Sequence, residues 1–182
     1  ANIIAQTTGI YQPQDGIINI FGGIIDAQET ISMKRGTLNV YDGLIHSYGE
    51  YCNPAKGNND GSEHTGAAIS LTSNDGYPGS INVNIYGGTM ISDNGNALYE
   101  GIAMRNGSPV AASSLVESIN IQNGRFSGER DYGAVSINKA ANVSISGGKY
   151  NTNIESLLTE NYRIATNRED DRFDYPYVVV SK

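Results

Sequence analysis

Apolar and polar residues alternate over short stretches that recur along the chain, and each stretch ends in a turn that contains glycine. The clearest copy is residues 81–90, INVNIYGGTM, in which Ile81, Val83 and Ile85 share one face of an extended segment. Successive side chains of a strand point to opposite faces, so this alternation predicts a half-buried strand. Related copies begin at residues 19, 39, 120 and 144, which indicates a repeat protein.

Aligning the copies predicts columns of residues that point inward. Two columns come from the strand, and a third follows the glycine turn, where a residue without Cβ adopts a positive φ at little cost. The predicted columns are Ile18, Leu38, Val83, Ile119 and Val143; then Ile20, Val40, Ile85, Ile121 and Ile145; and, after the turn, Ile25, Ile45, Met90, Phe126 and Tyr150.

A second set of strands precedes the first. Short apolar-polar-apolar phrases start at Ile69, Ile102 and Val135 at even spacing, and residues 31–36 belong to the same set. We therefore expect Ile69, Ile102 and Val135 to align. The distance between the two strand types varies, so each coil contains two or three short strands and loops of variable length. A solenoid tolerates such loops because they grow outward from the stack.

Charge and composition narrow the possible functions. The formal net charge is −7, which argues against nucleic acid as a partner, because phosphate contacts need clustered Lys and Arg. The chain has no run of about 18 apolar residues, so no membrane span is predicted.

The sequence starts at Ala1 with neither Met nor a signal peptide, from which we expect a processed or excised piece. Cys52 is the only cysteine and cannot form an internal disulfide.

Residues 1–16 hold two short candidate strands, around residues 3–4 and 10–11, ahead of the first clear copy. The end of a solenoid exposes a strand edge that recruits other chains unless it is covered. Because no polar capping helix is present here, these residues either cap the end themselves or are covered by a further N-terminal domain or an oligomer partner. We favour the second alternative.

Residues 46–66 form the longest polar insertion. Its run Asn-Asn-Asp-Gly-Ser-Glu at residues 58–63 contains Asp60 and Glu63, whose oxygens are ligands of the kind that calcium takes. These two residues are a candidate calcium site, and no other cofactor is expected. The spacing is not that of an EF-hand loop, and plain turn residues explain the run more simply.

One outward column is aromatic. Phe21, Tyr41 and Tyr86 occupy aligned positions, and Asn39 and Asn84 belong to a neighbouring column of amides. Adjacent strands lie about 4.8 Å apart, so the rings would form a ladder beside a row of amide donors. Sugar rings dock on flat aromatic faces and amides bind their hydroxyls, which makes these five residues a candidate glycan site. The alternative is that the rings stack on one another for stability alone.

Carboxylates on the loops are candidates for acid or base catalysis. Asp26, Asp42 and His46 are the only close cluster with that chemistry. No pair of acids recurs at aligned positions in neighbouring copies, and solvent-exposed turn residues explain the acids equally well. The sequence therefore assigns no catalytic residue.

The repeat pattern stops after Tyr150, so residues 1–152 are interpreted as coils and residues 153–182 as a C-terminal cap. A short helix is predicted over residues 153–160, followed by strands around residues 162–164 and 175–180. The charged residues between these strands, within 167–174, are expected to form a solvent-exposed turn. A cap that is polar outside and apolar inside stops the growth of a strand edge.

Several phrases resemble a known family, the right-handed parallel β-helix modules of bacterial surface proteins, in which "GG-T-F" repeats end in a "YL-x-x-GY … Y-x-V" segment. The matching stretches are residues 147–150, 154–158, 161–162 and 177–180. Asn161 stands where the family has Gly, and Lys149-Tyr150 where it has Thr-Phe. Similar modules also resemble pectate-lyase-like enzymes and phage fibre or tailspike tips. The calcium-binding acids and the catalytic Arg of the lyases have no match, so no catalytic residue is carried over.

The pattern and the resemblance together predict an all-β fold, a right-handed parallel β-helix of about five coils with a small cap of helix and strands. The leading functional hypothesis is a non-catalytic extracellular module (secreted, attached to a cell surface or on a virion) that contacts a polysaccharide or a cell-surface glycan. One alternative is a polysaccharide lyase or glycoside hydrolase of the pectate-lyase-like class. The other is a structural spacer or fibre piece, which an uncovered apolar outward column would favour.

Overall fold

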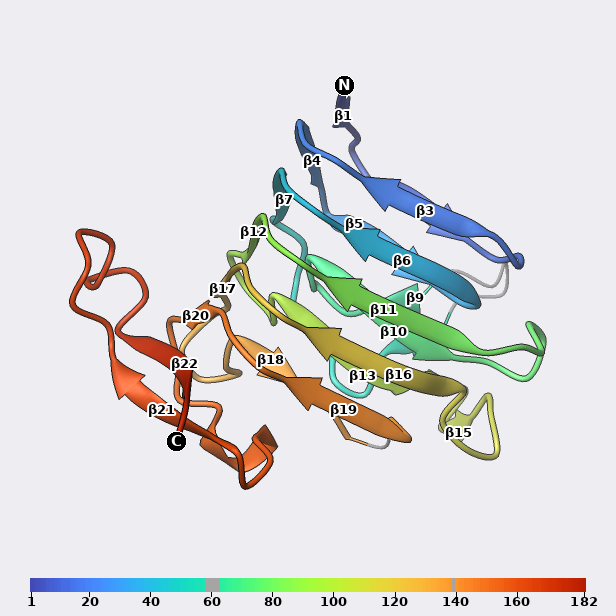
Figure 1. The fold of residues 1–182 in the computed structure, drawn as a ribbon. Coiled ribbons are helices and arrows are strands. Elements are labelled where there is room, and N and C mark those ends of the chain that lie inside the picture. Colours follow the sequence, from blue (N-terminus) through green and yellow to red (C-terminus); the bar gives the residue numbers. More distant parts are fainter. Residues whose placement is uncertain (58–62, 139) are drawn as a thin grey trace.

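The computed structural model describes residues 1–57, 63–138 and 140–182, and this part of the protein is all-β. Its strands form four sheets, three of which are entirely or largely parallel (Figure 1). The only helical element among the described residues is the 3-10 turn η1 (Glu155–Leu157). Within the same residues, no helix is long and apolar enough to cross a membrane. The predicted all-β class with parallel sheets is therefore confirmed.

The first parallel sheet is built from the most regular repeats, and its five strands have the order β19-β16-β11-β6-β3. These strands are β3 (Ile17–Ile20), β6 (Gly36–Val40), β11 (Ile81–Ile85), β16 (Val116–Ile121) and β19 (Asn142–Ile145). The register sets Val83 opposite Leu38 and Ile119, and it extends in the same way to the neighbouring strands. The first two predicted inward columns are confirmed.

The second sheet follows the glycine turns and has the order β1-β4-β7-β12-β17-β20-β22-β21. Its strands are β1 (Asn2–Ile4), β4 (Ile24–Ala27), β7 (Leu44–Ser47), β12 (Thr89–Ser92), β17 (Arg125–Ser127), β20 (Lys149–Tyr150), β22 (Tyr177–Ser181) and β21 (Tyr162–Thr166). Met90 lies opposite Ile45 and Phe126, which confirms the third column. The last two strands are antiparallel, so this sheet is mixed.

The third sheet corrects one predicted alignment. Its order is β18-β13-β10-β5-β2, and all its pairs are parallel. Its strands are β2 (Thr8–Gln12), β5 (Glu29–Met33), β10 (Ile69–Ser73), β13 (Leu98–Ile102) and β18 (Val135–Ser136). Ile69 lies opposite Ile31 as expected, but its partner on the other side is Leu98, not Ile102. Ile102 ends β13, because the next residues leave this sheet for a smaller one.

The smaller sheet anchors the long insertion, and its order is β15-β14-β8-β9. Its strands are β8 (Lys56–Gly57), β9 (Glu63–His64), β14 (Met104–Arg105) and β15 (Ser108–Pro109). Met104 pairs with Lys56 in parallel, whereas the other two pairs are antiparallel. The described part of residues 46–66, which we expected to be a polar loop insertion, thus contributes β8 and β9 to this sheet.

The chain passes through the three large sheets repeatedly in the same order. Successive passes use β2-β3-β4, β5-β6-β7, β10-β11-β12, β13-β16-β17 and β18-β19-β20. Each strand lies beside its equivalent from the previous pass, so the inner faces of all three sheets contribute to one apolar core. Figure 1 shows this as a stack of arrows that runs from the N-terminal end to the C-terminal strands β21 and β22. The arrangement is compatible with a parallel β-helix.

Glycine makes the corners between the first and second sheets possible. Gly88 has a φ of 88°, and a Cβ there would lie 3.1 Å from the carbonyl oxygen of Gly43 in the neighbouring pass. At Gly87 a Cβ would lie only 2.5 Å from the carbonyl oxygen of Tyr41. The left-handed conformation and the close approach of backbones both require a residue without a side chain.

The C-terminal residues form the two expected strands but only part of the expected helix. Residues 153–160 contain just η1, whose neighbour Ile154 is buried against the core. The charged turn differs from the prediction more strongly, because Asp171 is not simply solvated. Its carboxylate accepts from Lys149 Nζ at 2.9 Å and from Arg125 Nε at 2.8 Å. Lys149, and then Arg125 and Asn167, hold the pKa of Asp171 well below its usual value.

Candidate functional site

The predicted aromatic ladder forms, and its ring faces are largely used on one another. The centroids of Phe21 and Tyr41 are 4.9 Å apart with an interplanar angle of 11°, and those of Tyr41 and Tyr86 are 4.9 Å apart at 13°. Phe21 is 72% exposed, against 41% for Tyr41 and 37% for Tyr86. A sugar ring would therefore meet the outer side of Phe21 or the edges of the tyrosines, since stacking covers the faces between the rings.

The predicted amide column also forms, and it too is held together internally. Asn39 Nδ2 donates to Asn19 Oδ1 at 2.9 Å, Asn84 Nδ2 donates to Asn39 Oδ1 at 2.9 Å, and Asn120 Nδ2 donates to Asn84 Oδ1 at 3.0 Å. Each side chain thus links one pass of the chain to the next. The structure brings the five candidate glycan residues together as two self-paired columns, and their contact with a glycan stays a prediction.

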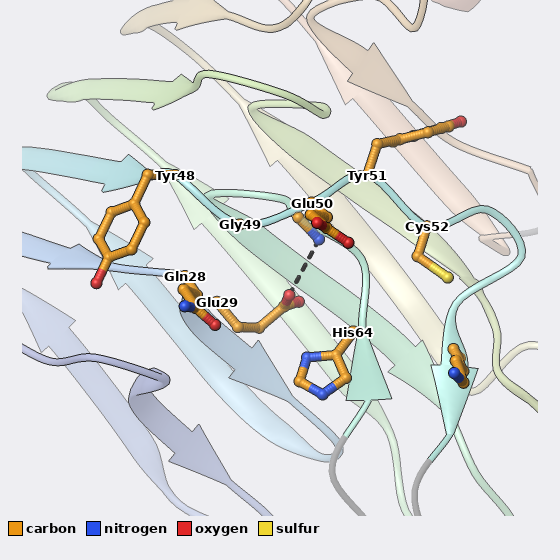
Figure 2. Close-up of a pocket in the computed structure, with 10 residues that line it drawn as sticks. Gln28, Glu29, Tyr48, Gly49, Glu50, Tyr51, Cys52 and His64 are labelled. Atoms are coloured by element: carbon orange, nitrogen blue, oxygen red, sulfur yellow. Dashed lines mark hydrogen bonds between the residues drawn. The ribbon is translucent and has the colours of Figure 1, made fainter.

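A pocket of about 640 Å³ lies elsewhere, between the start of β5, the end of β7 and the strands of the insertion (Figure 2). Its lining combines an amide, two carboxylates, an ammonium, an imidazole, a thiol and two phenols. The lining residues are Gln28, Glu29, Tyr48, Gly49, Glu50, Tyr51, Cys52, Lys56, His64 and Gly66. The polar insertion at residues 46–66 was singled out from the sequence as a candidate functional region. Nothing in the sequence around Gln28 and Glu29 indicated that these two residues would line a pocket.

Glu29 forms the floor of the pocket. Its side chain is buried, and its Oε2 accepts from the backbone N–H groups of Thr65 at 3.0 Å and Gly66 at 3.1 Å, the second of which Figure 2 marks. The hydroxyl of Thr65 donates to Oε1. Burial raises the pKa of Glu29, and the hydrogen bonds from Thr65 and Gly66 oppose that rise. This carboxylate fixes the backbone of the insertion against the coil.

Exposed polar groups lie around this floor. Gln28, Glu50 and Lys56 are exposed, as is His64. Tyr48 flanks the pocket and donates its hydroxyl to the carbonyl oxygen of Ala5 at 2.9 Å. Figure 2 shows the ring of Tyr51 pointing away from the other labelled side chains. The exposed groups supply hydrogen-bond donors and acceptors of both charges.

Tyr51 and Cys52 contribute to the wall of this pocket through their own contacts. The ring of Tyr51 stacks on Tyr132, with centroids 3.5 Å apart. The thiol of Cys52 donates to the carbonyl oxygen of Pro54 at 3.5 Å. This is a weak contact with backbone and not the pairing with a base that activates a cysteine nucleophile.

Of the two candidate calcium residues, the structure describes only Glu63. Asp60 lies outside the described residues. Glu63 is buried and forms an ion pair with Lys34, and it also accepts from Thr72 Oγ1 and from Asn74 Nδ2, the latter at 3.1 Å. An ammonium therefore stands beside this carboxylate in the position that a cation would use. Among the described residues, no three His, Cys, Asp or Glu side chains gather to hold a metal.

The cluster considered for acid and base catalysis forms only in part. His46 Nδ1 lies 3.0 Å from Asp26 Oδ1, as the sequence suggested, but the second carboxylate is Asp93, which lies 3.0 Å from Nε2. No hydrogen bond or ion pair joins Asp42 to His46 within the described residues. Partial burial lowers the pKa of His46, but Asp93 and Asp26 outweigh it and raise the pKa above its ordinary value. Both ring nitrogens are engaged, so the imidazole links successive passes of the chain.

Comparison with protein-family models, with curated proteins and with solved structures finds no match to this chain.

Proposed function

We propose that the protein is a non-catalytic extracellular binding and display module, built as a right-handed parallel β-helix of about five coils, and that its pocket takes a polysaccharide or a cell-surface glycan. The repeated passage through three sheets supports the β-helix, and the antiparallel strands β21 and β22 act as its C-terminal cap. The resemblance to β-helix modules of bacterial surface proteins supports the extracellular assignment.

The observation that carries the binding proposal is the pocket itself. A volume of about 640 Å³ is within the range of small-molecule sites. Planar amide and carboxylate groups, here Gln28 and Glu50, pair well with vicinal hydroxyls, while Lys56 adds donors. The phenol ring of Tyr48 offers an apolar surface at the rim. A neutral polyhydroxylated ligand matches this mixture better than an ion of one sign.

Two arguments favour binding over catalysis. First, both ring nitrogens of His46 are already bound, one to Asp26 and the other to Asp93. Second, the thiol of Cys52 donates to a backbone carbonyl oxygen. A general base or a nucleophile needs a reactive atom directed at the substrate, and these contacts occupy the reactive atoms of both residues.

A glycan array with three proteins tests the proposal and separates the two surfaces. The pocket variant is Glu50→Ala/Lys56→Ala, and the ladder variant is Tyr41→Ala/Tyr86→Ala. We expect the wild type and the ladder variant to bind the same glycans and the pocket variant to lose binding by at least about tenfold. Loss in the ladder variant alone would move the site to the aromatic column. No binding by the folded wild type would overturn the proposal, and repeating the array with EDTA tests the calcium prediction at Asp60.

A structural spacer or fibre piece is the second candidate, and one observation favours it. Phe21 is 72% exposed at the head of an aromatic column whose other members are also partly uncovered. Uncovered apolar surface of this kind marks places where proteins assemble. This role and glycan display are compatible, since a rigid stack can carry a binding pocket.

A further inference from the structure

A cluster of polar side chains is buried where the insertion meets the coils. Met33 lies opposite Leu71 in the parallel pair of β5 and β10, and both residues belong to the apolar core. Because successive side chains alternate between the two faces, the residues that follow them, Lys34 and Thr72, turn away from the core. Glu63 of β9 covers these two residues, since its carboxylate forms an ion pair with Lys34 and accepts from Thr72. An amine, a hydroxyl and a carboxyl group from three segments of the chain thus meet.

The amine and the carboxyl group are enclosed by protein. The side chains of Lys34 and Glu63 are both 0% exposed. Removing an ammonium and a carboxylate from water is costly, and transfer of one proton within the pair leaves a neutral amine and a carboxylic acid instead. Burial lowers the pKa of Lys34 to about 7, although the charge of Glu29 opposes this shift. A neutral lysine amine is a nucleophile, and this one lies directly against a carboxyl group.

The hydroxyl of Thr72 connects the amine to one carboxyl oxygen. Lys34 Nζ donates to Thr72 Oγ1, and Thr72 Oγ1 donates to Glu63 Oε2. A hydroxyl that accepts one hydrogen bond while it donates another can move a proton from the nitrogen to the oxygen. Oε2 is therefore the oxygen that can leave as water.

The other carboxyl oxygen is held by an amide. Asn74 Nδ2 donates to Glu63 Oε1 at 3.1 Å. The carbonyl oxygen of the same amide accepts from the backbone N–H of Gly76 at 2.9 Å, which fixes the direction of Nδ2. A donor aimed at an oxygen on which negative charge develops stabilises the transition state of acyl transfer. Asn74 therefore serves the oxygen that stays on the carbon.

We propose that Lys34 and Glu63 join in an intramolecular amide cross-link, with Nζ of Lys34 bonded to Cδ of Glu63 and one water released. Nζ attacks Cδ, and Asn74 stabilises the negative charge that forms on Oε1. Thr72 takes a proton from Nζ and passes its own to Oε2, the Cδ–Oε2 bond breaks, and Oε2 leaves as water. The step consumes no oxidant, reductant or cofactor. Its product has no charge on either residue, while Oε1 keeps its donor Asn74.

The cross-link would fasten the insertion to the coils beside the pocket. Glu63 is followed by His64, which lines that pocket. An amide bond persists in denaturant, whereas an ion pair does not, so the link would also hold these segments together in the unfolded chain. The proposal does not depend on glycan binding.

Intact-mass spectrometry of the protein in denaturant is the first test. We expect the wild type to be lighter than its sequence by one water, and digestion to yield a branched peptide that joins Lys34 to Glu63. Lys34→Arg keeps the positive charge but cannot form this amide, so it should have its full mass. Lys149→Arg is the matched control, because Lys149 also lies in an ion pair but near the surface, and it should retain the loss of water.

The rate of the reaction tests the role of Thr72. Protein that is expressed in insoluble form and then refolded starts at its full mass and contains the free ion pair, which is the form in which the stability of that pair is measured. Thr72→Val removes the proton relay and should slow the loss of water by at least about tenfold, while circular dichroism shows the same fold. Thr30→Val is the control, because Thr30 is equally buried but donates to the carbonyl oxygen of His46, and it should react at the wild-type rate.

Several outcomes would overturn the proposal. One is a folded wild type that keeps its full mass after several days. Another is a loss of water that persists in Lys34→Arg, or that digestion assigns to a succinimide at Asp75, which precedes a glycine. Loss of ammonia with a link from Lys34 to Asn74 would show that the amide, not the carboxyl group, is the acceptor. Equal rates for the wild type and Thr72→Val would exclude the proton relay.

Discussion

Two parts of the interior are stabilised in opposite ways. Inside the stack, the three predicted inward columns are apolar, and residues such as Ile85 lie opposite their equivalents one pass away. Next to the described part of the insertion, the buried groups are instead Lys34, Glu63 and Thr72, joined by hydrogen bonds and an ion pair, and Glu29, which accepts hydrogen bonds from the backbone of the insertion. We refer to these four residues as the charged layer.

The difference shows what each part contributes. An apolar column accepts any residue of suitable size, so it supports a stack without specifying its loops. The charged layer requires particular partners, because a buried charge without its counter-ion is expensive. We infer that the apolar columns supply most of the stability, and that the charged layer fixes the position of the insertion and hence the shape of the pocket.

The strongest disruption of the apolar part is Ile85→Asn. It removes a fully buried side chain and leaves an amide without partners, so the free energy of unfolding should fall by at least about 3 kcal/mol. Urea denaturation followed by circular dichroism measures this loss. Ile85→Val is the control and should cost about 1 kcal/mol. Equal effects of the two variants would contradict the burial of this column.

The charged layer responds most to removal of one partner. Lys34→Met leaves Glu63 buried without its counter-ion and should lower the free energy of unfolding by about 3–5 kcal/mol. The double variant Lys34→Met/Glu63→Leu removes both charges and should recover most of that loss. Denaturant unfolding of both variants checks this. If the double variant is as unstable as the single one, the loss does not come from the unpaired carboxylate of Glu63.

The ion pairs of Asp171 with Lys149 and Arg125, which lie near the surface, should contribute less to the free energy of unfolding than the charged layer does. Since the folded-state pKa of Asp171 is depressed, its contribution is present above the ordinary value of 3.8 and is lost as the pH falls through the folded-state value. Asp171→Asn should therefore cost about 1–2 kcal/mol at pH 7 and nothing in strong acid. Thermal unfolding between pH 2 and pH 7 tests this, with Asp170→Asn as the matched control. A gap that does not narrow between pH 4 and pH 2 would exclude the ion pairs as its cause.

The smallest expected effect concerns His46, which is partly exposed between Asp26 and Asp93. Because the folded-state pKa is raised, its stabilisation is present below about pH 6.5 and is lost as the pH rises through the folded-state value. His46→Gln should cost about 0.5–1 kcal/mol in mild acid and less at pH 8.5. Thermal denaturation at the two pH values measures the change. A cost that grows with pH would contradict the paired imidazolium.

The apolar columns could be predicted from sequence because each depends only on local alternation and on the glycine corner, and both recur. The same method misaligned Ile102, since the true partner of Ile69 begins the stretch Leu98-Tyr99-Glu100, in which Glu100 stands opposite buried Leu71 and breaks the pattern. A search for alternating apolar residues does not detect a strand that has a carboxylate at one of its inward positions.

The charged layer and the pocket could not be predicted in this way. Glu29 and Lys34 have the composition of a surface strand, and their partners Thr65 and Glu63 come from an insertion of no fixed length. Only the fold makes these residues neighbours. The aromatic ladder, by contrast, could be predicted, because the repeat places Phe21, Tyr41 and Tyr86 at equivalent positions of successive passes. The repeat could not indicate that the rings cover each other's faces.

The column of asparagines gives the stack a direction. Asn120, Asn84 and Asn39 each donate toward the N-terminal end, to Asn84, Asn39 and Asn19, so the amide dipoles along the row are aligned and reinforce one another. The row ends in an N–H group at Asn19 and begins with an oxygen at Asn120. The molecule therefore has a partially positive end and a partially negative end along this face, independent of its net charge. A group that extends the row at Asn19 must bring an acceptor, and each amide added there would polarise all those below it.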